Sequence, residues 1–294
     1  MSTQARVPTC NSPADMSSYD LQGKTVIVTG GAQGIGFGTC EALARRGANV
    51  VIVDLDQPRC DAAVDQLGIE NSAGFAADVT DPGAMQRVVS QTVERFGKVD
   101  VIIANAGIAN RGQTFRMMPT ETFERVLNVD LYGVIHTVRA ALPQIVENKG
   151  HVVVVSSVYA FVNGVGSTPY AIAKAGVEQF GRALRAELEP HGASASVAYF
   201  GFIDTQMVHD ALDNDPQAEK IRKLVPMPLR KRLKPAQAGE GIVVGIEKRA
   251  PRIIHPKRWA FVSTFRGVLN PLLDRAMGSS KLSRELVRDL DARN

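Results

Sequence analysis

Short, continuously apolar runs alternate with longer helical patterns from residue 21 onward, and this rhythm constrains the fold more than any other feature. Five runs are short and β-branched, as strands buried on both faces must be: Thr25–Val28, Val50–Val53, Val99–Ile103, His151–Val155 and Ser194–Ala198. Helical patterns lie between them, at Ile35–Arg46, Asp81–Phe96, Thr120–Glu147 and Tyr170–Glu189. Strands and helices in this order form βαβ units, so the sequence predicts a doubly wound α/β fold with helices on both faces of a parallel sheet.

The composition supports one large folded unit with additions at both ends. The chain has 294 residues, of which 45% are hydrophobic and 22% charged, and this excludes a disordered chain, a collagen and a coiled coil. Residues 1–20 are polar and without pattern, which predicts a disordered leader. The rhythm then predicts a main domain over residues 21–249 and a separate C-terminal extension over residues 250–294.

The cysteines and histidines give no sign of a metal site. Cys10, Cys40 and Cys60 have neither metal-ligand spacing nor the pattern of a disulfide framework, and the five histidines are scattered. We therefore expect no metal and a reducing compartment, the cytoplasm. The N-terminal segment lacks the apolar stretch of a secretory signal, and the longest uncharged run, residues 150–173, is too polar for a transmembrane helix.

A glycine-rich turn, TGGAQGIG at residues 29–36, joins the first predicted strand to the first predicted helix. Glycines in such a turn permit a tight bend, let the backbone approach a pyrophosphate, and let the helix pack closely on the strand. The helix N-terminus then offers its free N–H groups to the phosphates. Such turns also occur in ordinary loops, but the position between a strand and a helix favours dinucleotide binding. The residues expected to hold the cofactor here are Gly30, Gln33, Gly34, Ile35 and Gly36.

Asp54 ends the second predicted strand, 18 residues after Gly36. A carboxylate at this place can accept hydrogen bonds from both hydroxyls of the adenosine ribose and would repel a 2′-phosphate. No Lys or Arg follows Asp54 immediately, and the turn carries Gln33 rather than a basic residue. These features favour NAD over NADP, the alternative being a surface aspartate that caps a turn.

Tyr170 and Lys174 are four residues apart in a predicted helix, so they share one face of it. A pair of this kind is common on solvated helices. Here, however, Ser156 and Ser157 end a buried strand thirteen residues upstream, and open α/β sheets bind their ligands at such strand ends. No G-x-S-x-G motif surrounds Ser157, so a tyrosine–lysine pair suited to hydride chemistry is favoured over a serine hydrolase.

At this point the sequence resembles the classical short-chain dehydrogenase/reductase family over roughly residues 21–250. The resemblance rests on the glycine-rich turn, Asp78-Val79, Asn105-Ala106-Gly107, Ser157 and the Tyr170–Lys174 pair, in the family's order and spacing. It implies a Rossmann-type three-layer sandwich with a seven-stranded, mostly parallel sheet. It also implies a homodimer or homotetramer assembled through the helices predicted at residues 120–147 and 170–189.

The resemblance also implies the catalytic roles. Tyr170 would be the general acid/base, with its ordinary pKa of about 10 lowered by Lys174 and by the positive nicotinamide ring. Lys174 would also hold the nicotinamide ribose, and Ser157 would hydrogen-bond the substrate oxygen. Further cofactor contacts are implied at the adenine (Asp78, Val79), along the cleft (Asn105, Ala106, Gly107) and at the carboxamide (Ile203, Thr205).

Two positions depart from the family's pattern. The family usually has an Asn that supports a proton-relay water where this chain has Asp130, and we expect Asp130 to fill that role and to alter the pH optimum. After the sixth strand, the usual Pro-Gly is Phe200-Gly201. Proline would fix the backbone beside the nicotinamide, whereas Phe200 is expected to supply an aromatic wall.

The C-terminal quarter is basic and partly apolar. Residues 1–218 contain 16 basic and 23 acidic residues, whereas residues 219–294 contain 18 and 7. Phe261, Phe265 and Leu272 recur at helical spacing among basic residues. Three interpretations stay open: a helical appendage that covers the core or extends a subunit contact; a lid over the loop at residues 207–227; and attachment to a membrane surface, with Trp259, Phe261 and Phe265 at the interface. No module for nucleic-acid recognition accompanies the charge, so no nucleic-acid partner is expected.

Together these features predict an NAD-dependent alcohol dehydrogenase or ketone reductase. Hydride transfer would interconvert an alcohol, expected to be secondary and hydrophobic because Phe161, Phe200 and Phe202 surround the site, with its carbonyl compound. Two alternatives stay open. One is an NADPH-preferring fatty aldehyde or acyl-thioester reductase at a membrane surface, and the other is a cofactor-binding scaffold without turnover.

Overall fold

A parallel sheet of seven strands forms the centre of the computed structural model, which describes residues 18–110 and 112–292. The strands are β1 (Thr25–Thr29), β2 (Asn49–Asp54), β3 (Ser72–Ala76), β4 (Val101–Ala104), β5 (His151–Ser157), β6 (Ser194–Phe200) and β7 (Arg252–His255). Their order is β3-β2-β1-β4-β5-β6-β7, and every neighbouring pair is parallel. The predicted doubly wound fold is confirmed. The order reverses between β1 and β4, which makes the crevice beyond these two strands the expected ligand site.

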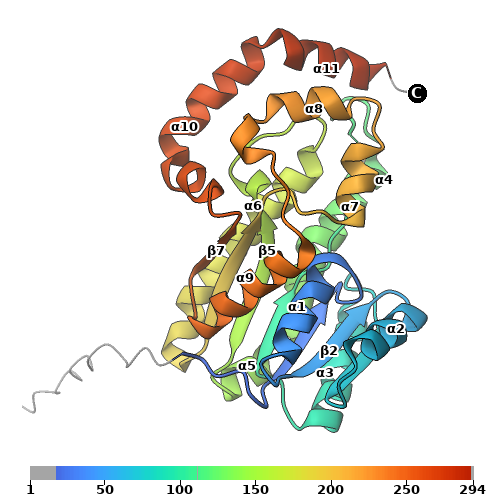
Figure 1. The fold of residues 1–294 in the computed structure, drawn as a ribbon, viewed down its shortest axis with the longest axis vertical. Helices are drawn as coiled ribbons and strands as arrows, with labels where there is room; N and C mark the ends of the chain where they lie inside the picture. The colour runs from blue at the N-terminus through green and yellow to red at the C-terminus, as the bar shows by residue number, and fades with distance from the viewer. Residues whose placement is uncertain (1–17, 111, 293–294) are drawn as a thin grey trace, which may run out of the picture.

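Helices cover both faces of the sheet (Figure 1). Helices α1 (Gly34–Ala44), α2 (Gln57–Leu67) and α9 (Pro235–Glu247) pack on one face, and α3 (Pro82–Phe96), α5 (Gly133–Glu147) and α6 (Thr168–Leu188) pack on the other. Side chains of one strand alternate between the two cores: Val26 and Val28 of β1 join the α1 side, and Ile27 joins the α3 side. Both faces are therefore apolar, which explains the continuous apolar runs in the sequence.

The helix predicted over residues 120–147 is interrupted. Helix α4 (Thr120–Leu127) passes into a π-helical turn at Asn128–Tyr132, and α5 begins at Gly133. A π turn inserts an extra residue without breaking the helix, and such turns occur often at functional sites. Apolar periodicity could not reveal this interruption because the apolar residues on both sides stay on the buried face. The turn contains Asp130, which is fully buried.

The predicted boundary at residue 249 falls one strand too early, because β7 follows it and pairs with β6. The sequence does not predict β7, because this strand has only four residues. Beyond it, α10 (Trp259–Ser279) and α11 (Lys281–Asp291) form an arch at one end of the molecule, over α8 (Ala218–Leu224) (Figure 1). Strand β3 and helices α2 and α9 also had no distinct signal in the sequence.

Helix α11 forms polar contacts with two segments that are distant from it in the sequence, the segment before α4 and helix α8. Its Asp291 accepts a hydrogen bond from Thr114 and lies 3.0 Å from Arg116, and Asp289 pairs with Lys220 of α8. Leu290 is fully buried. Among the three interpretations of the extension, these contacts favour a covering element near the loop that continues from β6. That loop holds α7 (Gln206–Val208), a π turn at His209–Asp213, and α8.

The end of the predicted leader is packed against the domain. The Tyr19 backbone N–H donates to Glu247 O at 2.6 Å, and the Arg249 guanidinium lies 4.4 Å from the centre of the Tyr19 ring. The leader predicted over residues 1–20 is therefore too long by these last residues. Residues 1–17 lie outside the described part of the chain.

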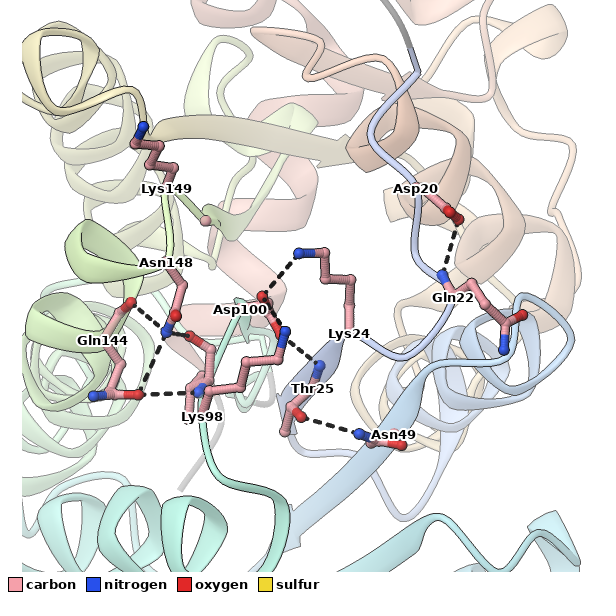
Figure 2. A network of polar contacts seen from close by, with 12 residues as sticks. Asp20, Gln22, Lys24, Thr25, Asn49, Lys98, Asp100, Gln144, Asn148 and Lys149 are labelled. Carbon is pink, nitrogen blue, oxygen red and sulfur yellow. Dashed lines mark hydrogen bonds and ion pairs between the residues drawn. The ribbon is translucent and has the colours of Figure 1, made fainter.

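Asp100 joins β1, β4 and β5 at the amino ends of the strands (Figure 2). Its side chain is 1% exposed and accepts hydrogen bonds from the Thr25 backbone N–H at 2.9 Å, Lys24 Nζ at 3.1 Å and Lys98 Nζ at 3.2 Å. Its carbonyl oxygen accepts from the His151 N–H at 2.9 Å. The Asp100 carboxylate therefore satisfies the first backbone N–H of β1, and the Asp100 carbonyl, directly before β4, accepts from the first residue of β5.

Replacing Asp100 should destabilise the fold. Asp100→Ala leaves the buried Thr25 N–H without its acceptor, and we expect the free energy of unfolding to fall by about 2 kcal/mol in urea titrations. Asp20→Ala is the matched control, because Asp20 is exposed and, among the described residues, accepts only the nearby Gln22 N–H; it should change stability by less than about 0.5 kcal/mol. Equal effects of the two substitutions would contradict the role given to Asp100.

His151, at the start of β5, is fully buried, and burial lowers its pKa from 6.5 to about 3. Its ring nitrogens lie 2.6 Å from Ser194 Oγ and 2.8 Å from Ser196 Oγ. The folded state therefore keeps this histidine neutral at pH values where an unfolded chain would protonate it. Stability contributed by the neutral ring is complete above about pH 6.5 and is lost as the pH falls toward about 3.

Acid sensitivity should therefore depend on His151. Between about pH 6 and pH 4, unfolding free energies of the wild type should fall by up to about 1.4 kcal/mol per pH unit through this group alone. His151→Gln should flatten that slope, although its stability at neutral pH is lower. His191→Gln, at an exposed position, should leave the slope unchanged. The same slope in wild type and His151→Gln would show that His151 does not carry the effect.

Candidate active site

A cavity of about 820 Å³ lies at the carboxyl ends of the central strands. It is lined by residues that end or follow five strands: Gly30 after β1, Asp54 of β2, Asn105 after β4, Ser157 of β5 and Phe200 of β6. The predicted site residues meet here, with one exception: Gly36 does not line the cavity. The predicted residues in its lining are Gly30, Gln33, Gly34, Ile35, Asp54, Asp78, Val79, Asn105, Ala106, Gly107, Asp130, Ser157, Tyr170, Lys174, Ile203 and Thr205.

The glycine-rich turn is as tight as its sequence predicts. Gly30 and Gly34 have positive φ angles of 61° and 54°, a region that favours glycine. Gly36 lies beneath the turn, and a Cβ atom there would come within 2.0 Å of Gly30 O. Asn105 Nδ2 donates to Thr29 O at 2.9 Å and to Gly30 O at 3.2 Å, which fixes the turn to the end of β4. The bare backbone of the turn thus forms a cradle at the start of α1, suited to a pyrophosphate.

The Asp54 carboxylate is oriented by two backbone groups at the end of β2. Oδ2 accepts from the Ala32 N–H at 3.2 Å, and Oδ1 accepts from the Leu55 N–H at 2.9 Å. Arg59, from the first turns of α2, lines the same cavity. Arg59 has no signal in the sequence because it does not directly follow Asp54, and only the geometry of helix α2 brings it back toward the cavity.

Tyr170, Lys174 and Ser157 lie together at the opposite part of the cavity. Lys174 Nζ is 5.4 Å from the centre of the Tyr170 ring and donates to Val155 O at 3.2 Å, and Ser157 Oγ donates a long hydrogen bond to Phe200 O at 3.4 Å. Ser156 instead donates to Lys174 O at 2.8 Å, so its hydroxyl anchors α6 to β5. Of the two serines, the geometry therefore favours Ser157 as the one available to a ligand.

Tyr159 was not singled out in the sequence, yet it packs against Tyr170. The two rings meet edge to face with centroids 5.7 Å apart. Such an arrangement restricts the orientation of the Tyr170 ring. Tyr159 lies in the 3₁₀ turn Val158–Ala160 directly after β5, a place that has no recognisable sequence signal.

Asp130 is brought beside Lys174 by the π turn. Its Oδ1 accepts the Ile108 N–H at 2.7 Å, and its Oδ2 lies 3.2 Å from Lys174 Nζ, with both side chains at most 5% exposed. Burial raises the pKa of Asp130 above its ordinary value, against the lowering by Lys174 and by the Ile108 hydrogen bond. Because this chain has Asp130 where the family usually has Asn, Lys174 forms a direct ion pair beside Tyr170.

Opposing effects act on the other two groups. Burial raises the pKa of Tyr170 above its ordinary value; the Lys174 charge offsets this only in part and the Asp130 charge raises the pKa further, so the lowering expected from Lys174 does not prevail in this structure. Burial alone would lower the pKa of Lys174, but Asp130 and Tyr170 hold it above its ordinary value. Lys174 therefore stays protonated at neutral pH, as a group that stabilises a nearby phenolate must.

The aromatic residues differ from expectation. Phe200 lines the cavity, but Phe161 does not: it packs in the core, with its ring centroid 5.8 Å from that of Tyr199. Trp259 is 3% exposed and covers Gly201, where a Cβ atom would come within 2.4 Å of Trp259 Nε1. The interpretation that places Trp259 at a membrane interface is wrong for this residue, because its indole is buried against Gly201.

Comparison with known proteins identifies the family. The sequence profile of the short chain dehydrogenase family matches residues 24–216. The chain belongs to the short-chain dehydrogenase/reductase family. It is therefore an oxidoreductase of a family that binds nicotinamide cofactors.

No group of His, Cys, Asp and Glu side chains in residues 18–110 and 112–292 could hold a metal ion.

Relatives with known names show the range of this family. The chain is 36% identical to L-rhamnose 1-dehydrogenase (NAD(P)(+)) of a Sphingomonas species over 213 residues, 70% of this chain and 83% of the relative. It is 32% identical to the 3-oxoacyl-[acyl-carrier-protein] reductase FabG of Escherichia coli over 200 residues, 68% and 81% of the two chains. The crystal structure of 3-ketoacyl-(acyl-carrier-protein) reductase from Brucella melitensis complexed with NADH matches with a TM-score of 0.70 at 26% identity, covering 80% of this chain and 96% of that one.

Gly36→Ala should damage the cradle. The added Cβ would meet Gly30 O at 2.0 Å, so the turn must open, and we expect a loss of about 1–3 kcal/mol in unfolding free energy together with loss of NADH-induced thermal stabilisation. Gly267→Ala is the control, since a Cβ there meets nothing within 4 Å. A Gly36→Ala protein that keeps its NADH-induced shift would show that the turn does not hold the nucleotide.

Proposed function

We propose that this protein is an NAD-dependent dehydrogenase or ketone reductase that interconverts a hydrophobic secondary alcohol and its carbonyl compound. The observation that carries the proposal is the grouping of Ser157, Tyr170 and Lys174 in one cavity with the glycine-rich cradle and Asp54. A dinucleotide fits this arrangement: the cradle exposes backbone to a pyrophosphate, and Asp54 presents a carboxylate to the adenosine ribose. When bound, the nicotinamide accepts or returns a hydride.

In this proposal, Tyr170 takes the hydroxyl proton during alcohol oxidation and returns it during carbonyl reduction. Ser157 donates a hydrogen bond to the substrate oxygen and holds it near the Tyr170 hydroxyl. Lys174 stabilises the Tyr170 phenolate by its charge, and Asp130 and Val155 O hold the ammonium group in place. Asp130 thereby acts as a positioning residue for Lys174 and supports a route by which protons reach solvent.

Two residues in the cavity have opposite effects on the choice between NAD and NADP. Asp54 is held with its carboxylate at the end of β2, where it would repel a 2′-phosphate. Arg59 lines the same part of the cavity and could attract that phosphate, but it is 63% exposed and lies 3.8 Å from Asp56. We favour NAD, because the fixed carboxylate outweighs an exposed and already paired guanidinium.

The substrate side of the cavity supports an apolar ligand. Phe200, Ile203, Met207 and Val208 contribute to its lining. An alternative function is reduction of a fatty aldehyde or an acyl thioester with NADPH, which the positive charge of Arg59 in the cavity lining favours. A cofactor-binding scaffold without turnover would not need the buried Asp130–Lys174 pair beside Tyr170.

Titration with the two reduced dinucleotides tests the choice of cofactor. We expect NADH to bind at least about tenfold more tightly than NADPH, and Asp54→Ala to abolish that difference, followed by nicotinamide fluorescence. Arg59→Gln should leave NADH affinity unchanged and weaken NADPH binding. Tighter NADPH binding in the wild type would reject the NAD assignment and favour the thioester or aldehyde reductase. Binding of neither dinucleotide would favour the scaffold.

Tyr170→Phe should separate chemistry from binding. Activity on a panel of hydrophobic secondary alcohols with NAD should fall by about 10²–10⁴-fold, while NADH affinity stays within about threefold of the wild type. Unchanged turnover in Tyr170→Phe would remove Tyr170 from the mechanism. Loss of NADH binding in this variant would indicate instead that the substitution disturbs the cavity.

The pH profile should respond to Asp130. Because the Asp130 charge raises the pKa of Tyr170, Asp130→Asn should lower that pKa and move the rise of oxidation activity toward lower pH, together with a reduced kcat. A structural loss alone would reduce kcat without moving the profile. Full activity of Asp130→Asn at every pH would end the proposed role of this residue.

We also propose a homodimer or homotetramer and a cytoplasmic location. The helices expected at the interface expose apolar side chains: Tyr132 between α4 and α5 is 50% exposed, and Ile172 of α6 is 47% exposed. Within the described residues, no helix is long and apolar enough to cross a membrane.

A further inference from the structure

Helix α10 exposes a continuous apolar stripe. Phe261, Phe265, Val268 and Leu272 are spaced by four, three and four residues, so they lie on one side of the helix, and each is 50–70% exposed. The rings of Phe261 and Phe265 are in contact, with centroids 4.8 Å apart. Apolar residues scattered over a surface need no explanation, but four in one row on an element of this length mark an interaction surface.

The opposite side of α10 is fastened to the protein. Trp259 and Ser263 are buried, and Arg266 pairs with the buried Glu178 of α6 at 2.7 Å. Asp274 accepts a hydrogen bond from Asn163 at 2.7 Å. The stripe therefore lies on the side of α10 that faces away from these contacts.

The charges around the stripe are positive. Exposed Lys257 precedes α10, and exposed Arg275 lies three residues after Leu272 and so on the same side of the helix. Within residues 18–110 and 112–292, neither has a carboxylate partner, whereas Asp274, the acidic residue of α10, is bonded to Asn163. Apolar side chains flanked by unpaired cations are suited to binding a surface that has an apolar interior and negatively charged groups on its outside.

We propose that the stripe of α10 docks this protein on an anionic lipid surface. Phe261, Phe265, Val268 and Leu272 enter the region between headgroups and acyl chains, and Lys257 and Arg275 lie at the level of the headgroups. The role of Trp259 differs from a membrane anchor: it fixes the start of α10 to Gly201 and so sets the orientation of the stripe.

Charge also argues against a second copy of the chain as the occupant of this surface. A two-fold contact places the same patch on both partners, so Lys257 and Arg275 of one chain would meet the same cations of the other. With Asp274 turned toward Asn163, the patch offers no acidic group in return. An anionic bilayer supplies the missing negative charge and the apolar phase together.

Sedimentation with lipid vesicles tests the proposal on the full chain. We expect binding to mixed phosphatidylcholine–phosphatidylglycerol vesicles, weaker binding at high salt, and little binding to phosphatidylcholine alone. The combined variant Phe261→Gln, Phe265→Gln and Leu272→Gln should bind about tenfold or more weakly. Met227→Gln is the matched control, because Met227 is 77% exposed at another place and should not affect binding.

A variant without the two cations tests the electrostatic contribution to vesicle binding separately from the apolar contribution. Lys257→Gln with Arg275→Gln should remove the preference for anionic vesicles, whereas Arg87→Gln on α3, at the far end of the molecule, should keep it. Circular dichroism and thermal unfolding confirm that each variant is folded. NADH titration of every variant reports the nucleotide site separately, so failure of the lipid proposal is distinguished from failure of the proposed function.

Three results would overturn the proposal. The first is absence of wild-type binding to anionic vesicles at low salt. The second is equal binding by the wild type and the combined stripe variant. The third is loss of an oligomer in the stripe variant, by sedimentation equilibrium, without any vesicle binding by the wild type, which would assign the surface to a second copy.

Discussion

Burial of the sheet on both faces is the constraint on which the rest of this structure depends. Side chains of β1 alternate between two apolar cores, so polar groups have little room along the strands and gather at their ends. The two ends are used differently. At the amino ends, Asp100 and His151 satisfy buried backbone and side-chain groups. At the carboxyl ends, the turn after β1, Asp54 and Ser157 face a cavity. Polar groups at the amino ends of the strands stabilise the fold, whereas those at the carboxyl ends line the cavity of the candidate active site.

The buried pair of Asp130 and Lys174 links local helix geometry to the site. A regular helix over residues 120–147 would not contain the π turn that carries Asp130 toward Lys174. The pair is almost completely shielded from water, so its charges act strongly on the Tyr170 hydroxyl. The ion pair therefore places two opposite charges close to the Tyr170 hydroxyl, one that lowers its pKa and one that raises it.

Sequence reasoning was most successful where a physical requirement leaves a local pattern. The apolar runs located five strands, and the glycine-rich turn and the spacing of Tyr170 and Lys174 located both parts of the cavity. It failed where structure depends on contacts distant in sequence. Strand β7 has four residues and is defined by pairing with β6, Arg59 reaches the cavity through the geometry of α2, and Trp259 is buried only because Gly201 leaves space for it.

The contacts of α11 have a consequence for how the chain reaches its final form. Asp289 and Asp291 bind residues on both α8 and the segment before α4, and both segments continue into residues that line the cavity. During synthesis, the sheet strands emerge from the ribosome in order, and most of the sheet can assemble early. The segments around the substrate side gain their common partner only once residues 281–291 have been made. The segments on the substrate side therefore gain this support from a part of the chain that is translated well after the dinucleotide cradle at residues 29–36.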